Sequence, residues 1–261
     1  MYSFSATLAG LCREGESFVV APGAEWLQGR TIYGGLSAAL AIEAAQRMFP
    51  DLPPLRGAQI AYVGPSSGSL SIRPQILRAG RSASFVSVSV SSDGAAALQA
   101  TLCFAAHRPS ALSYQELARP SAPAPQSCEP FFNAVFAPRS SRQFDGRIAG
   151  GGRAVSAAAT PSLLLWLRHR DETAPDTVSS IVALADAPPP GAFTMFKTPA
   201  PISTMTWSFE LLADAFKSTA WHLARSFGDV VEGGYSSQST CLWDTDGRPV
   251  IVGRQLVALY Q

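Results

Sequence analysis

The chain has 261 residues, of which 47% are hydrophobic and 15% charged, so it can bury the core of one large domain or two ordinary ones. Its net charge of +1 gives no reason to expect binding to nucleic acid or to an anionic membrane. The four cysteines form no CxxC pair and the three histidines lie far apart, which favours a cytoplasmic protein with reduced thiols and no metal site. Neither a signal peptide nor a membrane span is expected, because no apolar run is long enough.

The clearest helix signal lies at residues 36–49, in the run LSAALAIEAAQRMF. The run is alanine-rich and apolar on nearly every side, which is typical of a buried helix. Gly34 and Gly35 precede it, and Pro50 ends it.

Strand patterns follow this helix and end in a hairpin. Segments 59–63, 69–77, 82–90 and 95–104 are predicted strands, and Asp93-Gly94 is a turn signal between the last two. A stretch rich in Pro, Ser and Ala then predicts an extended linker over residues 108–130.

The second half repeats this order. Residues 133–144 and 154–168 look like strands, and 176–187 look like a helix with Asp176 as its N-cap. Four further strands are predicted at 204–212, 220–227, 235–243 and 249–260, with a turn at Asp246-Gly247 between the last two.

The two hairpin turns therefore lie at corresponding places in two halves of the chain. This weak repeat predicts two copies of one unit, at residues 1–107 and 131–261, each with a sheet wrapped around its helix. An unrelated α+β domain is the alternative.

Three segments carry a family resemblance: RTIYGGLSAALAIEAA (30–45), LRAGRSASFVSVSVSSDG (77–94) and WDTDGRPVIVGRQLVALY (243–260). In this order and spacing they resemble the thioesterase II-type acyl-CoA thioesterases. The resemblance implies an α+β double hotdog, in which two antiparallel sheets each wrap a central helix and pack as an intrachain pseudo-dimer. It also implies a hydrolase of lipid metabolism that binds acyl-CoA and releases free acid and CoA with an oriented water, without metal or organic cofactor. Further association into a homo-oligomer would not be needed to build the site.

In that family an aspartate, a threonine and a glutamine of the second repeat orient the attacking water. The glutamine corresponds to Gln255, the threonine to a position near Asp229, and the aspartate to Met205. Methionine cannot deprotonate water, so the sequence leads to the hypothesis that Asp229 takes over the carboxylate role.

The glycine pair before the first helix is a candidate substrate site. Backbone N–H groups at Gly35 and Leu36 would lack partners within the helix and could receive the thioester oxyanion, and Gly34 would let the carbonyl approach closely. The alternative is that two glycines only allow a tight turn into a buried helix.

The other candidates also have two interpretations. By strand alternation Gln255 shares a face with Val257, or else it faces solvent beside Arg254. Asp229 is either a buried general base or an ordinary turn residue.

Thr204 and Thr206 flank Met205 and could hold a water, although threonine is common in strands. Gln59 opens the matching strand of the first repeat and could face the same cavity.

Two alternative functions stay open. Met205 favours an acyl-thioester-binding protein that has lost catalysis. A hotdog hydratase acting on enoyl-CoA would need an Asp/His pair, and His107, His169 and His222 all lie away from the helix start.

Overall fold

The structure, a computed structural model, describes residues 3–133 and 137–261. Its α-helices are α1 (Phe4–Ala9), α2 (Gly34–Met48) and α3 (Val178–Ala185), and its 3-10 turns are η1 (Ala24–Trp26), η2 (Pro125–Ser127), η3 (Arg139–Gln143) and η4 (Gly191–Met195). The strands of the first half are β1 (Cys12–Glu14), β2 (Ser17–Val20), β3 (Leu27–Gln28), β4 (Thr31–Ile32), β5 (Leu55–Tyr62), β6 (Leu70–Ala79), β7 (Ala83–Ser92) and β8 (Ala95–Ala105). Those of the second half are β9 (Phe144–Gly151), β10 (Ser162–His169), β11 (Ile202–Leu211), β12 (His222–Glu232), β13 (Tyr235–Trp243) and β14 (Pro249–Leu259).

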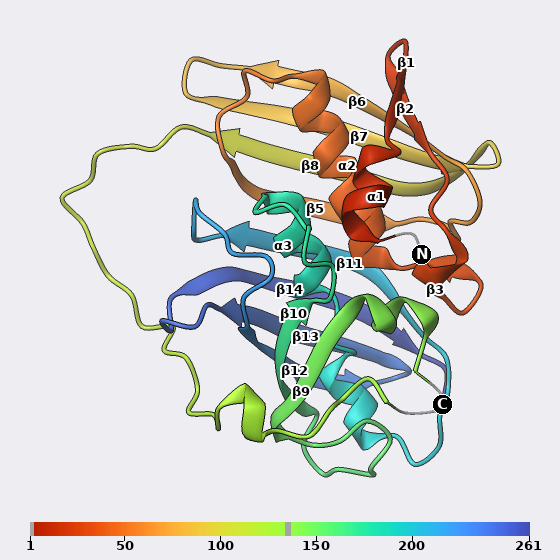
Figure 1. Cartoon of the computed structure of the whole chain (residues 1–261), viewed down its shortest axis with the longest axis vertical. Helices are drawn as coiled ribbons and strands as arrows, with labels where there is room; N and C mark the ends of the chain where they lie inside the picture. Colours follow the sequence, from red (N-terminus) through yellow and green to blue (C-terminus); the bar gives the residue numbers. More distant parts are fainter. Residues whose placement is uncertain (1–2, 134–136) are drawn as a thin grey trace.

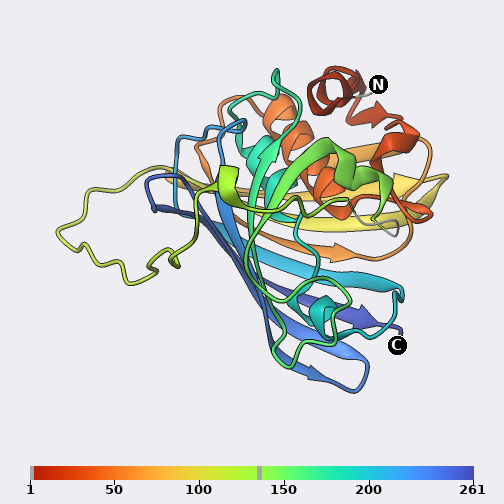
Figure 2. The ribbon, with the colours of Figure 1, turned by 60° about the horizontal axis from the view of Figure 1, so that its bottom comes forward.

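Helix α2 is buried, as its composition predicts. Leu36, Leu40 and Ile42 have no exposed surface, and the alanines between them let other elements approach closely. Helix α2 packs on α3, and both helices lie on one side of the curved sheet (Figures 1 and 2). The core fills the space between this helix pair and the inner face of the sheet.

The strands form one twelve-stranded antiparallel sheet in the order β1-β2-β6-β7-β8-β5-β11-β14-β13-β12-β10-β9, beside the small ribbon β3-β4. The two halves have the same strand order counted outward from the centre. In each, the strand after the main helix is central, and the last strand of that half lies next to it.

The expectation of two separate sheets needs correction, because β5 and β11 pair edge to edge. Trp207 is opposite Ile60 and Phe209 is opposite Ala58 in this joint. An unpaired strand edge leaves a row of backbone donors and acceptors without partners, and each half satisfies that row with the other.

The hairpins follow the turn signals. Asp93 and Gly94 both have positive φ, of 50° and 80°, as a two-residue turn with the twist of the flanking strands requires. In β7 the valines at 86, 88 and 90 are buried, and Ser87 and Ser89 lie on the outer face. This alternation puts the valines on the inner face against the helices and leaves Ser87 and Ser89 on the outer face, together with the exposed Phe85.

Two predicted strands of the second half are wrong in extent. Of the segment 133–144, residues 134–136 lie outside the described residues, 139–143 form η3 after Pro138, and β9 begins at Phe144. Residues 154–161 form no strand because Val155 and Ala157 adopt positive φ and donate backbone hydrogen bonds around η4. Helix α3 begins at Val178 with Thr177 as its N-cap, because the Asp176 carboxylate instead accepts from the Ser218 N–H.

The linker lacks helix and strand from Ala106 to Ala124 and projects as a loop at the left of Figure 1. Near its end it is fastened to the second half, where the Trp243 indole donates to the Leu117 carbonyl and Trp166 donates to that of Pro123.

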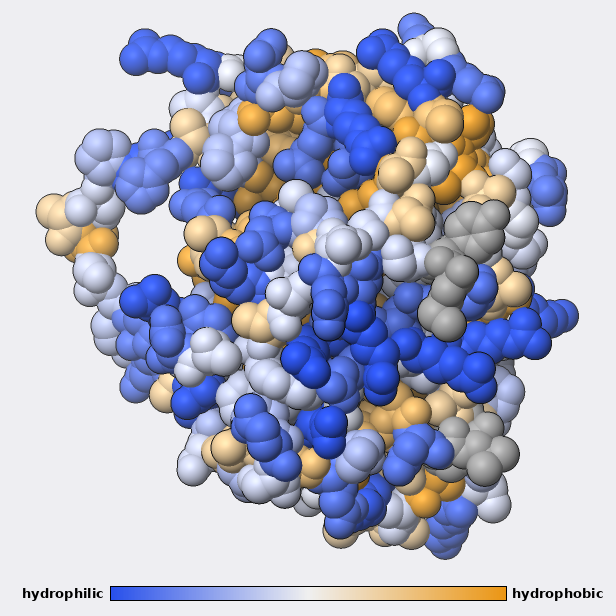
Figure 3. Space-filling view, in the orientation of Figure 1, coloured by the Kyte–Doolittle hydropathy of each residue, from blue (hydrophilic) through white to orange (hydrophobic). Residues whose placement is uncertain are grey.

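The face of the molecule in Figure 3 carries hydrophilic residues across its centre with smaller hydrophobic areas between them. Among the described residues, no helix is long and apolar enough to cross a membrane.

Candidate active site

A carboxylate that the sequence reasoning did not select lies at the meeting point of the two main helices. Asp186 is the C-cap residue of α3. Its carboxylate accepts a hydrogen bond from the backbone N–H of Gly35, in the first turn of α2, and another from Gln255 Nε2 at 2.7 Å. The site thus joins the start of the first main helix, the end of the second, and the last strand.

The glycine pair is what allows this contact. A Cβ added to Gly35 would lie 2.6 Å from Tyr33 Cζ and 2.8 Å from Asp186 Cβ, and one added to Gly34 would lie 3.2 Å from Asp186 Oδ2. Real Cβ atoms do not tolerate contacts under 3.0 Å, so a side chain at Gly35 would displace the carboxylate. The glycines therefore serve close packing around Asp186 as well as the turn into α2.

The electrostatic setting raises the pKa of Asp186 to about 7. Burial of the carboxyl group is the main cause, and the hydrogen bonds from Gln255 and Gly35 act in the opposite direction because they stabilise the ionised form. Although the residue keeps some accessible surface, its carboxyl group is desolvated. A carboxylate with a pKa near neutrality is suited to accept and return a proton.

Two tyrosines enclose this carboxylate. Tyr33 donates its hydroxyl to the Ala183 carbonyl at 2.7 Å, and Tyr62, at the end of β5, donates to the Gly34 carbonyl at 3.2 Å. Burial, followed by the nearby negative charge of Asp186, raises the pKa of both phenols well above 10. Both tyrosines therefore stay protonated at neutral pH.

Gln255 lies where strand alternation predicts, on the inner face and 7% exposed. Its carbonyl Oε1 accepts from Gln238 Nε2 at 2.6 Å, so its amide group points toward Asp186. The solvent-facing alternative is thereby excluded for this residue.

Asp229 lies on the other face of the sheet. It sits at a bulge in β12, where its carboxylate pairs with Arg254 at 3.0 Å and accepts from Ser239 Oγ at 2.6 Å. Arg254 and Gln255 are adjacent in β14 and point to opposite faces, so Asp229 cannot reach a water held by Gln255. The hypothesis of Asp229 as the base does not fit this geometry.

The bulge at Met205 in β11 separates the two threonines. Thr204 is opposite the buried Val257, on the inner face with Gln255, whereas Thr206 is opposite the exposed Leu256 on the outer face. Met205 itself is 41% exposed. Of the two threonines, only Thr204 is placed on the side of Asp186.

Three further predicted residues have placements that differ from expectation. Gln59 is exposed on the outer face between Ala58 and Ile60, which are buried, so it does not face the site. The N–H groups of Gly35 and Leu36 are both engaged, the first with Asp186 and the second with the Tyr33 carbonyl at 3.1 Å.

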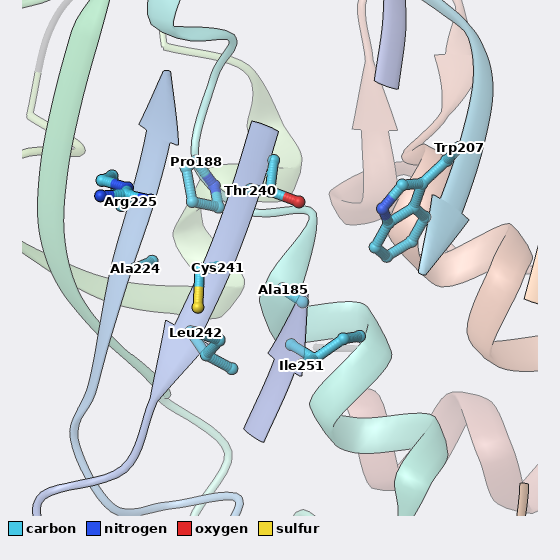
Figure 4. A pocket seen from close by; sticks show the side chains of 9 residues that line it. All are labelled: Ala185, Pro188, Trp207, Ala224, Arg225, Thr240, Cys241, Leu242 and Ile251. Atoms are coloured by element: carbon cyan, nitrogen blue, oxygen red, sulfur yellow. The ribbon is translucent and has the colours of Figure 1, made fainter. Parts of the chain in front are cut away.

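Two cavities lie at opposite ends of the helix pair. A void of about 10 Å³ beside the end of α3, lined by residues that include Ala185, Trp207 and Cys241, is at the lower limit for holding a single water (Figure 4). A larger cavity of about 420 Å³ lies at the opposite end of the helix pair, between Arg47, Val178 and Phe216. Asp186 lines neither of these two cavities.

One sequence signal could have identified Asp186. The segment LADAPPP places an acidic residue at the end of an apolar helix, where the negative end of the helix dipole disfavours it. A residue that is locally unfavourable needs a compensating interaction, and here that interaction comes from the N-terminus of α2 and from Gln255.

Solved structures with the same fold include a hot dog-fold protein of unknown function from Alicyclobacillus acidocaldarius, at 25% identity and a TM-score of 0.90, with 99% of this chain and 98% of that chain covered. The tesB protein of Mycobacterium avium subsp. paratuberculosis gives 19% identity and a TM-score of 0.80 over 99% and 98% of the two chains. An acyl-CoA thioesterase II, TesB2, from Mycobacterium marinum gives 16% and 0.76 over 97% of each. The chain thus has the hot dog fold. No curated protein sequence matches it significantly.

Family models match almost the whole chain. The acyl-CoA thioesterase N-terminal domain matches residues 23–105, and the acyl-CoA thioesterase C-terminal domain matches residues 115–259. This confirms the resemblance drawn from the three sequence segments, and the chain belongs to the acyl-CoA thioesterase family.

Proposed function

We propose that this protein hydrolyses acyl-CoA thioesters to free acid and CoA, with Asp186 as the general base. The observation that carries the proposal is the buried Asp186 carboxylate, held between the start of α2 and Gln255 with its pKa raised to about 7. Family membership supports thioester hydrolysis in general, and the placement of Asp186 supplies the carboxylate that Met205 does not.

In the proposed mechanism a water bound beside Asp186 attacks the thioester carbonyl carbon while the carboxylate takes one of its protons. The carbonyl oxygen becomes an oxyanion, and we place it at the positive end of the α2 dipole. The tetrahedral intermediate then collapses, the carbon–sulfur bond breaks, and the thiolate of CoA recovers the proton from Asp186. One acyl-CoA and one water thus give one free acid and one CoA thiol, and the reaction needs no further reactant.

Thr204 completes the proposed water site. It lies on the inner face near Gln255, across the β11–β14 pair, and its hydroxyl can both donate to and accept from a water. We assign to Asp186, Thr204 and Gln255 the three roles that the family resemblance implies.

The fold supports an intrachain pseudo-dimer as the frame of this site. The equal strand order of the halves, the β5–β11 joint and the α2–α3 contact are what two hotdog units packed together would produce. Gly35 and Tyr62 come from the first unit and Asp186 and Gln255 from the second, so one chain would supply every named group.

A hydratase has less support, because the interactions that shift the pKa of Asp186 include none from a histidine. His169 is buried, bonds to the Ser180 carbonyl through Nε2 at 2.8 Å, and packs beside Phe4 and Phe144.

The direct test is release of free CoA thiol from acyl-CoAs of graded chain length. We expect turnover that rises to a maximum at one range of chain lengths, with stoichiometric free acid. Binding across the panel without thiol release would reject the proposal in favour of an acyl-thioester-binding protein.

The pH dependence of hydrolysis follows from the state of Asp186. The base acts when ionised, so kcat/KM should fall about tenfold per pH unit below pH 7 and level off above it. A rate profile on a non-ionising acyl chain measures this, and an acid limb centred near pH 4 would mean that the base is an ordinary exposed carboxylate.

A further inference from the structure

We propose that Gln238 is a positioning residue that fixes the direction of the Gln255 amide, so that its N–H group and not its carbonyl faces Asp186. The inference rests on the proposed role of Asp186. It arises from a row of hydrogen bonds that crosses the inner face of the second half, from η4 to the end of α3.

The row consists of two buried amides in series. Gln238 in β13 is 1% exposed and lies directly opposite Gln255 in β14. Gln238 Nε2 donates to Gln255 Oε1 at 2.6 Å, and Gln255 Nε2 donates to Asp186 Oδ1 at 2.7 Å. Each donor in the series therefore points toward the carboxylate.

The donor-to-acceptor direction of these hydrogen bonds is set by a backbone N–H group at the end farthest from Asp186. The Gly191 N–H donates to Gln238 Oε1 at 3.1 Å, and Ser226 Oγ donates to the same oxygen at 3.5 Å. A backbone N–H can only donate, so the amide atom facing it must be the oxygen, and the Gln238 NH₂ group must face Gln255.

The close contact between the Gly191 backbone and its neighbours depends on the absence of a side chain. A Cβ on this residue would clash with the Pro161 carbonyl oxygen and would lie 2.8 Å from that of Ser226. Only glycine brings its N–H this close to the strand, so the close packing at Gly191 positions the donor that orients Gln238.

The consequence for Asp186 is electrostatic. A Gln255 amide turned over by half a rotation would place its carbonyl oxygen against the carboxylate, which repels it, and would remove a hydrogen bond that stabilises the ionised form. The other titratable groups whose charges interact with Asp186 are Tyr33 and Tyr62, and their hydroxyls are bonded to backbone carbonyls. Gln255 is thus the side-chain amide that stabilises the ionised form of Asp186 against the effect of burial, and Gln238 orients Gln255.

The test compares Gln238→Met, Gln255→Met and the double variant by ¹³C NMR titration of the Asp186 carboxyl group and by the pH profile of kcat/KM. Methionine keeps the length of glutamine and removes both amide atoms. We expect the pKa of Asp186 to rise by about 1 in each single variant, which lowers kcat/KM about tenfold at pH 6. Because Gln238 acts through Gln255, the double variant should match Gln255→Met alone.

Ser236→Ala is the matched control. Ser236 lies in the same strand, two residues before Gln238, is fully buried, and its hydroxyl has no hydrogen-bond partner within the described residues. It should leave the Asp186 titration unchanged.

Gln238→Leu guards against a variant that does not fold, since it also removes the donor to Gln255 and places no charge at this buried position. We again expect a raised pKa of Asp186. An unchanged titration in the folded Gln238 variants, or additive effects in the double variant, would overturn the inference. If the titration shifts while the parent protein releases no thiol, the relay stands and the proposed function fails alone.

Discussion

Asp186→Asn should lower kcat for acyl-CoA hydrolysis by at least about 10²-fold, with little change in KM. Asparagine has nearly the shape of aspartate and can still accept from Gly35, but it cannot take a proton from water. Removal of a general base typically costs about 10²–10⁴-fold in rate. Steady-state kinetics on the best substrate of the panel measure the loss.

The variant should also lose the acid limb centred near pH 7, because the group that titrates there is gone. The matched control is Asp229→Asn, which removes a carboxylate from the outer face of the same half. It should keep the parent kcat within about twofold, since an exposed pair with Arg254 contributes little. Full activity in Asp186→Asn together with a loss in Asp229→Asn would return the base to Asp229.

Gly35→Ala should have the second largest effect, because it inserts one methyl group where the site has no space. The new Cβ would lie 2.6 Å from the Tyr33 ring and 2.8 Å from Asp186 Cβ, so the start of α2 or the end of α3 must move. Overpacking of this kind typically lowers the free energy of unfolding by about 1–3 kcal/mol. A misplacement of about 1 Å at the site would lower kcat roughly 10²-fold.

Chemical denaturation and kinetics on the same preparation separate the two effects. Gly10→Ala is the control, because Gly10 has a negative φ of −73° and its added Cβ would meet its nearest neighbours at 3.5 Å, an ordinary contact. It should leave kcat unchanged and the unfolding free energy equal or slightly higher. Parent-like activity in Gly35→Ala would show that the start of α2 adapts without disturbing Asp186.

Local sequence patterns were sufficient where local physics decides the structure. The all-round apolar composition of α2 predicted its burial, and the Asp-Gly pairs predicted both hairpins. Period-two alternation put Gln255 on the face of Val257, which the structure shows to be the inner face, and family segments predicted the fold that the comparisons show. These features depend on residues near one another in the chain.

Residues 154–161 show where this reasoning fails. Their composition suits a strand, but their conformation is set by contacts with η4, which lies about forty residues further along the chain. Tertiary contacts therefore prevent a strand here, and no local pattern in the segment predicts this.

Only the tertiary structure shows which carboxylate lies beside Gln255. Asp186 and Asp229 are both plausible bases by residue type. Because the family's aspartate was matched to Met205, the sequence suggested that this chain lacks a carboxylate at that position. The packing of α2 against α3 brings Asp186 to Gly35, while Asp229 follows the inward-facing Gly228 in β12 and lies on the outer face, paired with Arg254. Gly35 and Asp186 are 151 positions apart in the chain, and no local periodicity in the sequence predicts a contact between them. The sequence determined the fold and the inward position of Gln255, and the long-range packing of the two helices determined the position of the carboxylate that we propose as the base.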